Sequence, residues 1–239
     1  MSLNPGWLMW FMELCKTNGL TVDDAILDIG ASELFCSDAP SSLNDFLSSL
    51  GARAYDDEEL TRIADRSFAG DLFRRAGFRY DAVDYAKFPG IIRLDMNVDE
   101  LPEKYHGRYK FINNSGTSEH ILNQYNVFKI IHDAAAPGAL MYHGVPGWGE
   151  YEHGIIGYSP KFFWALATAN DYEIVRFWGW ADNKPTPLKA EFMEQIAFTH
   201  SPIAERVWLH ILLRKRTNAP FQGLNDPAFN SNWDKPAQA

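Results

Sequence analysis

Several apolar runs of this sequence stop at acidic or amide residues. The run that begins at Ala25 reaches Asp28 and then Gly30, and later runs close on Asp84, on Asp95, and on Asn113, Asn114 and Ser115. Helix-like patterns separate several of these runs, and such alternation predicts a mostly parallel sheet with helices on both faces. In a sheet of this kind, ligands bind at the carboxyl ends of the strands. The polar residues therefore mark a predicted ligand site along one edge of the sheet.

The same periodicity places the individual elements. The expected strands are 25–30, 79–86, 90–97, 109–116, 139–146, 172–180 and 205–215. The expected helices are 41–51, 56–77, 119–139 and 159–171, the last with Ser159 as N-cap and Pro160 in its first position. The apolar segment 6–14 is expected to be a helix that packs on the domain, or a lid or a dimer face, so a homodimer is left open.

Composition excludes some classes of function. The net charge is -9 and the pI is near 5.2, whereas nucleic-acid binding requires a basic face. The segment 6–14 is too short for a membrane span, which needs about 20 apolar residues, and no basic residues precede it as in a secretory signal. Cys15 and Cys36 are therefore expected to be free thiols in a reducing compartment, and the protein is expected to be cytoplasmic.

The first strand end does not carry the full dinucleotide fingerprint G-x-G-x-x-G. Gly30 is followed by Ser32 where a second glycine would allow close approach of a pyrophosphate, so a ligand without a pyrophosphate fits better. An acid at 84 can accept hydrogen bonds from two ribose hydroxyls, and one at 95 can meet an exocyclic amine. Each acid also has a plain interpretation as a solvated strand end.

These motifs resemble those of the class I S-adenosylmethionine-dependent methyltransferases. ILDIGASE resembles their first motif, AVDYA the strand whose acid holds the ribose, and IIRLDMN the segment beside the adenine. YKFINNSGTSEHILNQ, PGALMYHGVP and the ending YEIVRFWGW…ERVWLHILLRK resemble the later strands, over about residues 25–216. More narrowly, 114–133 and 153–174 resemble a bacterial branch of undefined substrate.

The resemblance implies a fold, a cofactor and a set of binding residues. It implies a single α/β domain over 1–239, with a Rossmann-like seven-stranded, mostly parallel sheet and an antiparallel last strand. It implies S-adenosylmethionine as cofactor and S-adenosylhomocysteine as product. The implied cofactor-binding residues are Asp28, Gly30, Ser32, Asp84, Asp95, Met96, Asn113 and Ser115.

Two departures from the family pattern affect the expected site. Ser32 replaces the usual second glycine, beside the methionine tail of the cofactor. About 50 residues separate Gly30 from the second sheet strand, so Phe35–Asp65 is interpreted as an insertion. We expect 1–20 and 35–65 to form a lid or cap over the site, and 217–239 to be an extended C-terminal tail.

Methyl transfer needs alignment and, for a hydroxyl acceptor, a base. His153 is the first candidate for a base or acceptor contact, because it lies in a glycine-rich loop after the fifth strand and histidine titrates near neutral pH. His143, within that strand, is the second candidate. Glu119 suits a helix N-terminus by charge alone. A metal cluster of His143, His153, Glu150 and Glu152 matches no familiar ligand spacing, so no metal is predicted.

The sequence therefore predicts a methyltransferase that acts on a small-molecule acceptor, a sugar or a secondary metabolite, by O- or N-methylation. The alternative is a non-catalytic protein that keeps the fold and a nucleoside site. An NAD-dependent dehydrogenase is disfavoured by the incomplete glycine pattern. A hydrolase is disfavoured because Ser115 and Ser118 lack the G-x-S-x-G elbow.

Overall fold

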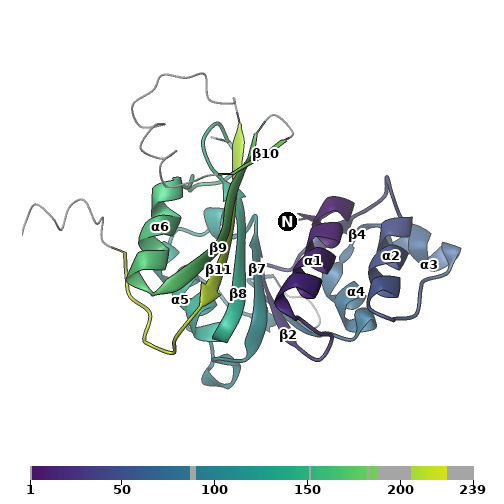
Figure 1. The fold of residues 1–239 in the computed structure, drawn as a ribbon, viewed down its shortest axis with the longest axis horizontal. Coiled ribbons are helices and arrows are strands. Elements are labelled where there is room, and N and C mark those ends of the chain that lie inside the picture. The colour runs from purple at the N-terminus through teal and green to yellow at the C-terminus, as the bar shows by residue number, and fades with distance from the viewer. Residues whose placement is uncertain (1, 87–89, 151, 182–183, 188–205, 225–239) are drawn as a thin grey trace, which may run out of the picture.

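The computed structural model describes residues 2–86, 90–150, 152–181, 184–187 and 206–224. Its main sheet has eight strands in the order β10-β9-β11-β8-β7-β2-β5-β6 (Figure 1). These are β2 (Ala25–Ile29), β5 (Arg79–Asp84), β6 (Ile92–Arg93), β7 (Tyr109–Ser115), β8 (Ala135–Pro146), β9 (Tyr172–Ala181), β10 (Lys184–Pro187) and β11 (Val207–Lys215).

Strand directions follow the expected Rossmann-like pattern. Neighbouring strands from β6 to β8 are parallel, and β11 runs antiparallel to both β8 and β9. The mostly parallel sheet with an antiparallel last strand is therefore confirmed. The short β10, which pairs with β9, was not predicted.

Helices cover both faces of this sheet (Figure 1). One face carries α5 (Gln124–Ala134) and α6 (Pro160–Ala169), and the other carries α1 (Pro5–Asn18) and α4 (Ala69–Ala76). Adjacent residues of a strand point to opposite faces, so Ile26 and Leu27 belong to different apolar cores, as do Leu140 and Met141. Ser159 caps α6 as expected, by accepting a hydrogen bond from the Phe162 N–H.

The segment between β2 and α4 forms a layer of its own. It contains α2 (Ser41–Ser49), α3 (Asp57–Ile63) and two strands of a small sheet, in which β3 (Glu33–Phe35) lies between β1 (Ser2–Leu3) and β4 (Asp65–Phe68). The single helix predicted over 56–77 is therefore wrong. Helix α3 ends at Ile63, and β4, which contains Arg66 with a φ of 54°, pairs with β3 before α4 begins.

Two other predicted elements are shorter than expected. The strand expected over 90–97 is reduced to β6, since Asp95 caps a turn by accepting a hydrogen bond from the Asn97 N–H. The helix expected from residue 119 begins at Gln124 with Asn123 as N-cap. Two 3₁₀ turns, η1 (Glu103–Tyr105) and η2 (Ser118–His120), precede β7 and α5 respectively.

The N-terminal helix is part of the apolar core. Phe11 is fully buried, and its ring lies against Trp7, Phe73 and Phe111. Met9, on the same helix, is 64% exposed. Cys15 and Cys36 are buried and unpaired, and no helix in the described ranges has the length and apolar character that a bilayer crossing needs.

Phe11→Ala should therefore lower the free energy of unfolding by about 3–5 kcal/mol, the usual cost of removing a core phenylalanine. Met9→Ala is the matched control and should change it by less than about 0.5 kcal/mol, because its side chain is largely in water. Urea denaturation followed by circular dichroism measures both. Equal small effects would show that α1 does not belong to the core.

Candidate active site

A buried carboxylate lies near the carboxyl end of the central strand. Asp28 is fully buried, and its oxygens accept hydrogen bonds from the Tyr80 hydroxyl at 2.5 Å, Asn113 Nδ2 at 2.8 Å and the Ser32 N–H at 3.0 Å. These donors come from β5, from β7 and from the turn after β2. The carboxylate therefore connects three adjacent strands to the first turn of the predicted site.

Burial raises the pKa of Asp28 from its ordinary 3.8 to about 6, although the hydrogen bonds from Ser32, Tyr80 and Asn113 act in the opposite direction. Removal from water disfavours the ionised form more than these donors favour it. The Asp28 carboxylate is thus hydrogen-bonded by Ser32, Tyr80 and Asn113, and these bonds hold the strand ends in place.

A cavity of about 280 Å³ opens at the carboxyl ends of β2, β5 and β7. Gly30, at the first strand end, has a φ of 85°, a left-handed conformation that favours glycine, and its N–H donates to the Val83 carbonyl at 2.7 Å. The turn that it makes brings Ala31 to the cavity wall. The lining residues are Gly30, Ala31, Asp84, Tyr85, Met96, Gly116, Thr117, His120 and Ile121.

Asp84 is the carboxylate that faces this cavity. Its Oδ2 accepts a hydrogen bond from the Ala31 N–H at 2.8 Å, and its Oδ1 accepts one from the Ala86 N–H at 2.8 Å. A carboxylate has about four acceptor positions, so both oxygens keep capacity for ligand hydroxyls. The two backbone amides fix the orientation of the carboxylate toward the cavity.

The structure brings together only part of the predicted binding set. Gly30, Asp84 and Met96 line the cavity. Asp28, Ser32 and Asn113 lie behind its wall in the buried network, and neither Asp95 nor Ser115 is among the described lining residues. Gly116, Thr117, His120 and Ile121 also line the cavity and were not among the predicted binding residues, although they lie within the quoted stretch 109–124.

The segments predicted to form a lid pack against the domain. Residues 1–20 and 35–65 contribute none of the described lining of this cavity, and the apolar side chains of α1 and α2 pack in the same core as α4. Closure of these segments over a bound ligand stays a prediction. In the predicted C-terminal tail, 217–224 has no helix or strand, and the rest lies outside the described residues.

A second buried network positions the turn η2. Asn114 Nδ2 donates to Ser118 Oγ at 2.9 Å and lies 3.1 Å from His143 Nδ1. Burial lowers the pKa of His143 to about 3, so its ring stays neutral near pH 7 and Nδ1 accepts from the amide. His143 is enclosed by Phe128 and Phe163 and lines none of the described cavities. His143 thus supports the position of the Asn114 side chain.

The turn η2 presents Glu119 and His120 toward the loop after β8. The fully buried Glu119 has its Oε1 3.2 Å from His153 Nε2 and 3.9 Å from His120 Nε2. Burial raises the pKa of Glu119, and this rise is opposed by a hydrogen bond from its own backbone and by the charge and hydrogen bonding of the nearby His153. Burial and the neighbouring His153 both lower the pKa of His120. The structure thus joins His153 to Glu119 and His120, and not to His143.

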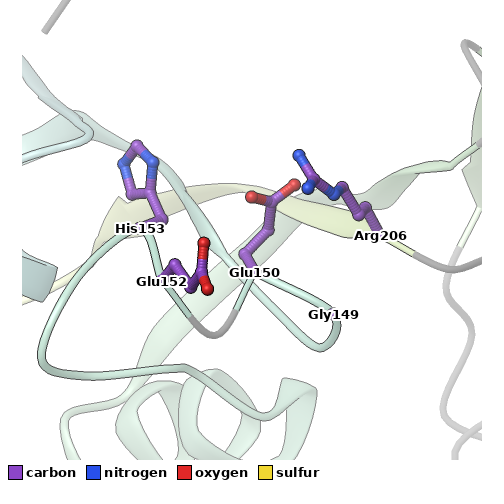
Figure 2. A pocket seen from close by; sticks show the side chains of 5 residues that line it. All are labelled: Gly149, Glu150, Glu152, His153 and Arg206. Carbon is purple, nitrogen blue, oxygen red and sulfur yellow. The ribbon is translucent and has the colours of Figure 1, made fainter.

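A second cavity, of about 440 Å³, lies on the other side of His153. Figure 2 shows its charged lining, with Glu150, Glu152 and His153 on one loop and Arg206 just before β11. His120 lines the strand-end cavity and His153 lines this one, and their ring centroids are 5.5 Å apart. The Glu119, His120 and His153 side chains therefore adjoin both cavities.

Comparisons with known proteins support the fold. No protein-family model matches the sequence, and a search of curated proteins gave no match. The structure is similar to a proposed sarcosine dimethylglycine methyltransferase from Galdieria sulphuraria, with a TM-score of 0.51 and 15% identity over 89% of this chain and 85% of that one. The chain therefore shares the Rossmann-like fold of that methyltransferase, as the resemblance implied.

A second similar structure is the 1,6-didemethyltoxoflavin-N1-methyltransferase of Burkholderia thailandensis, solved with 1,6-didemethyltoxoflavin and S-adenosylhomocysteine. Its TM-score is 0.47, with 12% identity over 88% of this chain and 78% of that one.

The raised pKa of Asp28 predicts a specific pH dependence of stability. Between about pH 4 and pH 6 the native state binds more protons than the unfolded state, so this group's contribution to the unfolding free energy falls as pH rises. Asp28→Asn cannot titrate there. The stability of the wild type relative to Asp28→Asn should therefore fall across this window, by at most about 1.4 kcal/mol per pH unit, and become flat above it.

Urea denaturation of both proteins from pH 4.5 to pH 7.5 measures this difference. The lost acceptor for Tyr80, Asn113 or Ser32 adds an offset that does not depend on pH. A difference that is constant, or that grows with pH, would contradict the raised pKa.

Proposed function

We propose that this chain is an enzyme that transfers a methyl group from S-adenosylmethionine to a small-molecule acceptor. The observation that carries the proposal is the cavity at the carboxyl ends of β2, β5 and β7, lined by Gly30, Asp84 and Met96. The likeness of the chain's fold to that of a proposed methyltransferase supports the same conclusion.

The residues of this cavity fit a nucleoside cofactor. The Asp84 carboxylate keeps acceptor capacity for two ribose hydroxyls, and Met96 and Ile121 offer apolar surface for a flat base. Gly30 and Gly116 both have positive φ values and leave the backbone uncovered along the wall. We assign the amino-acid end of the cofactor to the part of the cavity between Gly30 and Thr117.

When bound, S-adenosylmethionine supplies an electrophilic methyl group: an acceptor lone pair bonds to the methyl carbon as the C–S bond breaks, and the C–S electron pair returns to sulfur to give S-adenosylhomocysteine. The protein contributes alignment of the two reactants. We assign the acceptor to the cavity beside His153, whose Glu150, Glu152 and Arg206 suit a polar molecule. An oxygen or nitrogen acceptor is favoured, because His153 can contact it or take its proton.

Asp84→Ala should weaken S-adenosylmethionine binding by roughly 1–3 kcal/mol, the cost of losing hydrogen bonds to a charged group. Asp84→Asn retains the shape and should also weaken binding. Asp71→Ala, on an α4 carboxylate whose side chain is 75% exposed, is the control for loss of a negative charge. Calorimetry with S-adenosylmethionine and S-adenosylhomocysteine measures the effect. Unchanged affinity in Asp84→Ala would contradict the assignment of Asp84 to the ribose hydroxyls.

His153→Ala should lower turnover by about 10²–10⁴-fold and leave cofactor affinity nearly intact, because its imidazole lines the second cavity and not the first. His106→Ala removes an exposed imidazole outside both cavities and is the matched control. Formation of S-adenosylhomocysteine over pools of hydroxyl and amine acceptors measures turnover. Cofactor binding without product over all pools would favour the non-catalytic alternative.

A further inference from the structure

Glu119 has a buried carboxylate with one close imidazole contact. Its side chain is fully buried, and no donor is well aligned with Oε1 or Oε2 in the described residues. His153 Nε2 lies 3.2 Å from Oε1, and its charge and hydrogen bonding oppose the rise in the pKa of Glu119. A carboxylate has about four acceptor positions, so this contact leaves capacity that a bound cation can use.

Two imidazoles, those of His120 and His153, lie close to this carboxylate. One ligand atom each from Glu119, His120 and His153 can be chosen so that all three lie within 4.8 Å of one another. The two histidine side chains are 51% and 37% exposed, so each can turn without disturbing the core. Ligand atoms at about 2.0–2.2 Å from a tetrahedral metal lie about 3.3–3.6 Å apart, a separation that small side-chain rotations reach from the observed 3.2 and 3.9 Å.

We propose that Glu119, His120 and His153 bind one divalent transition-metal ion. Two imidazole nitrogens and one carboxylate oxygen form a donor set that suits Zn²⁺, Co²⁺ or Fe²⁺ and leaves coordination positions open. Ca²⁺ and Mg²⁺ prefer sets made entirely of oxygen. The sequence did not reveal this set, because His153 lies 33 positions beyond His120 and reaches Glu119 only through the fold of the loop.

The position of the cluster gives the cation a role, which rests on the proposed function. His120 lines the cavity assigned to the cofactor and His153 lines the cavity in Figure 2, so the cation adjoins both. A cation there binds an oxygen of the acceptor and lowers the pKa of that hydroxyl, whose proton leaves to solvent through the second cavity. The inferred acceptor class is therefore an alcohol, a phenol or an enol, and with the cation bound the role of His153 narrows from contact or proton acceptance to ligation of the metal.

The absence of a side chain at Gly154 leaves the space that Glu119 occupies. A Cβ at Gly154 would lie 2.7 Å from Glu119 Cγ and 3.0 Å from the Glu119 carbonyl oxygen, which itself accepts the N–H groups of Ile155 and Ile156. An alanine at 154 must therefore displace Glu119. A Cβ at Gly157 would meet nothing closer than 3.5 Å, so Gly157→Ala is a matched control for a glycine change in the same loop.

The test uses the full chain, stripped with a chelator and then titrated with Co²⁺ and with Zn²⁺ in the absence of cofactor and acceptor. We expect one equivalent to bind, with a visible Co²⁺ absorption band and a raised melting temperature. Glu119→Gln, His120→Ala and His153→Ala should each weaken binding by more than about 100-fold, and Gly154→Ala by about 10–100-fold, as for loss of an outer support. Gly157→Ala should bind like the wild type.

Titration of the wild type without saturation below about 100 μM metal would overturn the proposal. So would unchanged binding in both His120→Ala and His153→Ala, whose exposed positions keep the fold intact if Glu119→Gln does not fold. The metal titration needs no cofactor, so its failure is separable from failure of S-adenosylmethionine to bind. If the metal binds and turnover with hydroxyl acceptors does not depend on it, the site stands and its catalytic role is rejected.

Discussion

The burial of the Asp28 carboxylate determines how the strand ends are arranged. Burial of an ionisable group away from water is costly unless donors surround it, and here they come from Tyr80, Asn113 and Ser32. Those three residues belong to both neighbouring strands and to the following turn, so their positions are set together. Once the turn is fixed, Ala31 donates to Asp84, and the wall of the strand-end cavity follows. Asp28, which the sequence suggested as a ligand contact, therefore positions the turn and the strands that form the cavity wall.

The positions of the strand ends could be read from the sequence, but the direction of each side chain could not. Apolar runs and their polar ends are local, and parallel strands bring those ends to one edge, where Gly30, Asp84 and Met96 line one cavity. Whether a strand residue faces the cavity or a neighbouring strand depends on long-range register. Asn113 pairs with Asp28 across the sheet, and the next residue, Asn114, turns to His143 on the opposite face.

Long-range packing also decided where the inserted layer went. Leu43, Phe46 and Leu47 give α2 an apolar face that must be buried, and the sequence shows this need without showing the partner. The partner is the aromatic core around α1 and α4, where Phe11 and Phe46 both lie close to Phe73. The pairing of β4 with β3 then interrupts what reads locally as one continuous helix, because strand hydrogen bonds to a distant segment outweigh the helix preference of a few residues.

The two fully buried carboxylates of the described residues differ in a way that bears on function. Asp28 is surrounded by neutral donors from the protein, and its site is complete. Glu119 has no well-aligned donor, and its closest contacts are two half-exposed imidazoles beside two cavities, at 3.2 and 3.9 Å. Interaction with a helix dipole does not explain the charge of Glu119 either, because η2 has three residues and α5 begins later, at Gln124. The contrast with Asp28 supports the proposed cation site, because the Glu119 carboxylate keeps acceptor capacity beyond its contact with His153 that a bound cation would use.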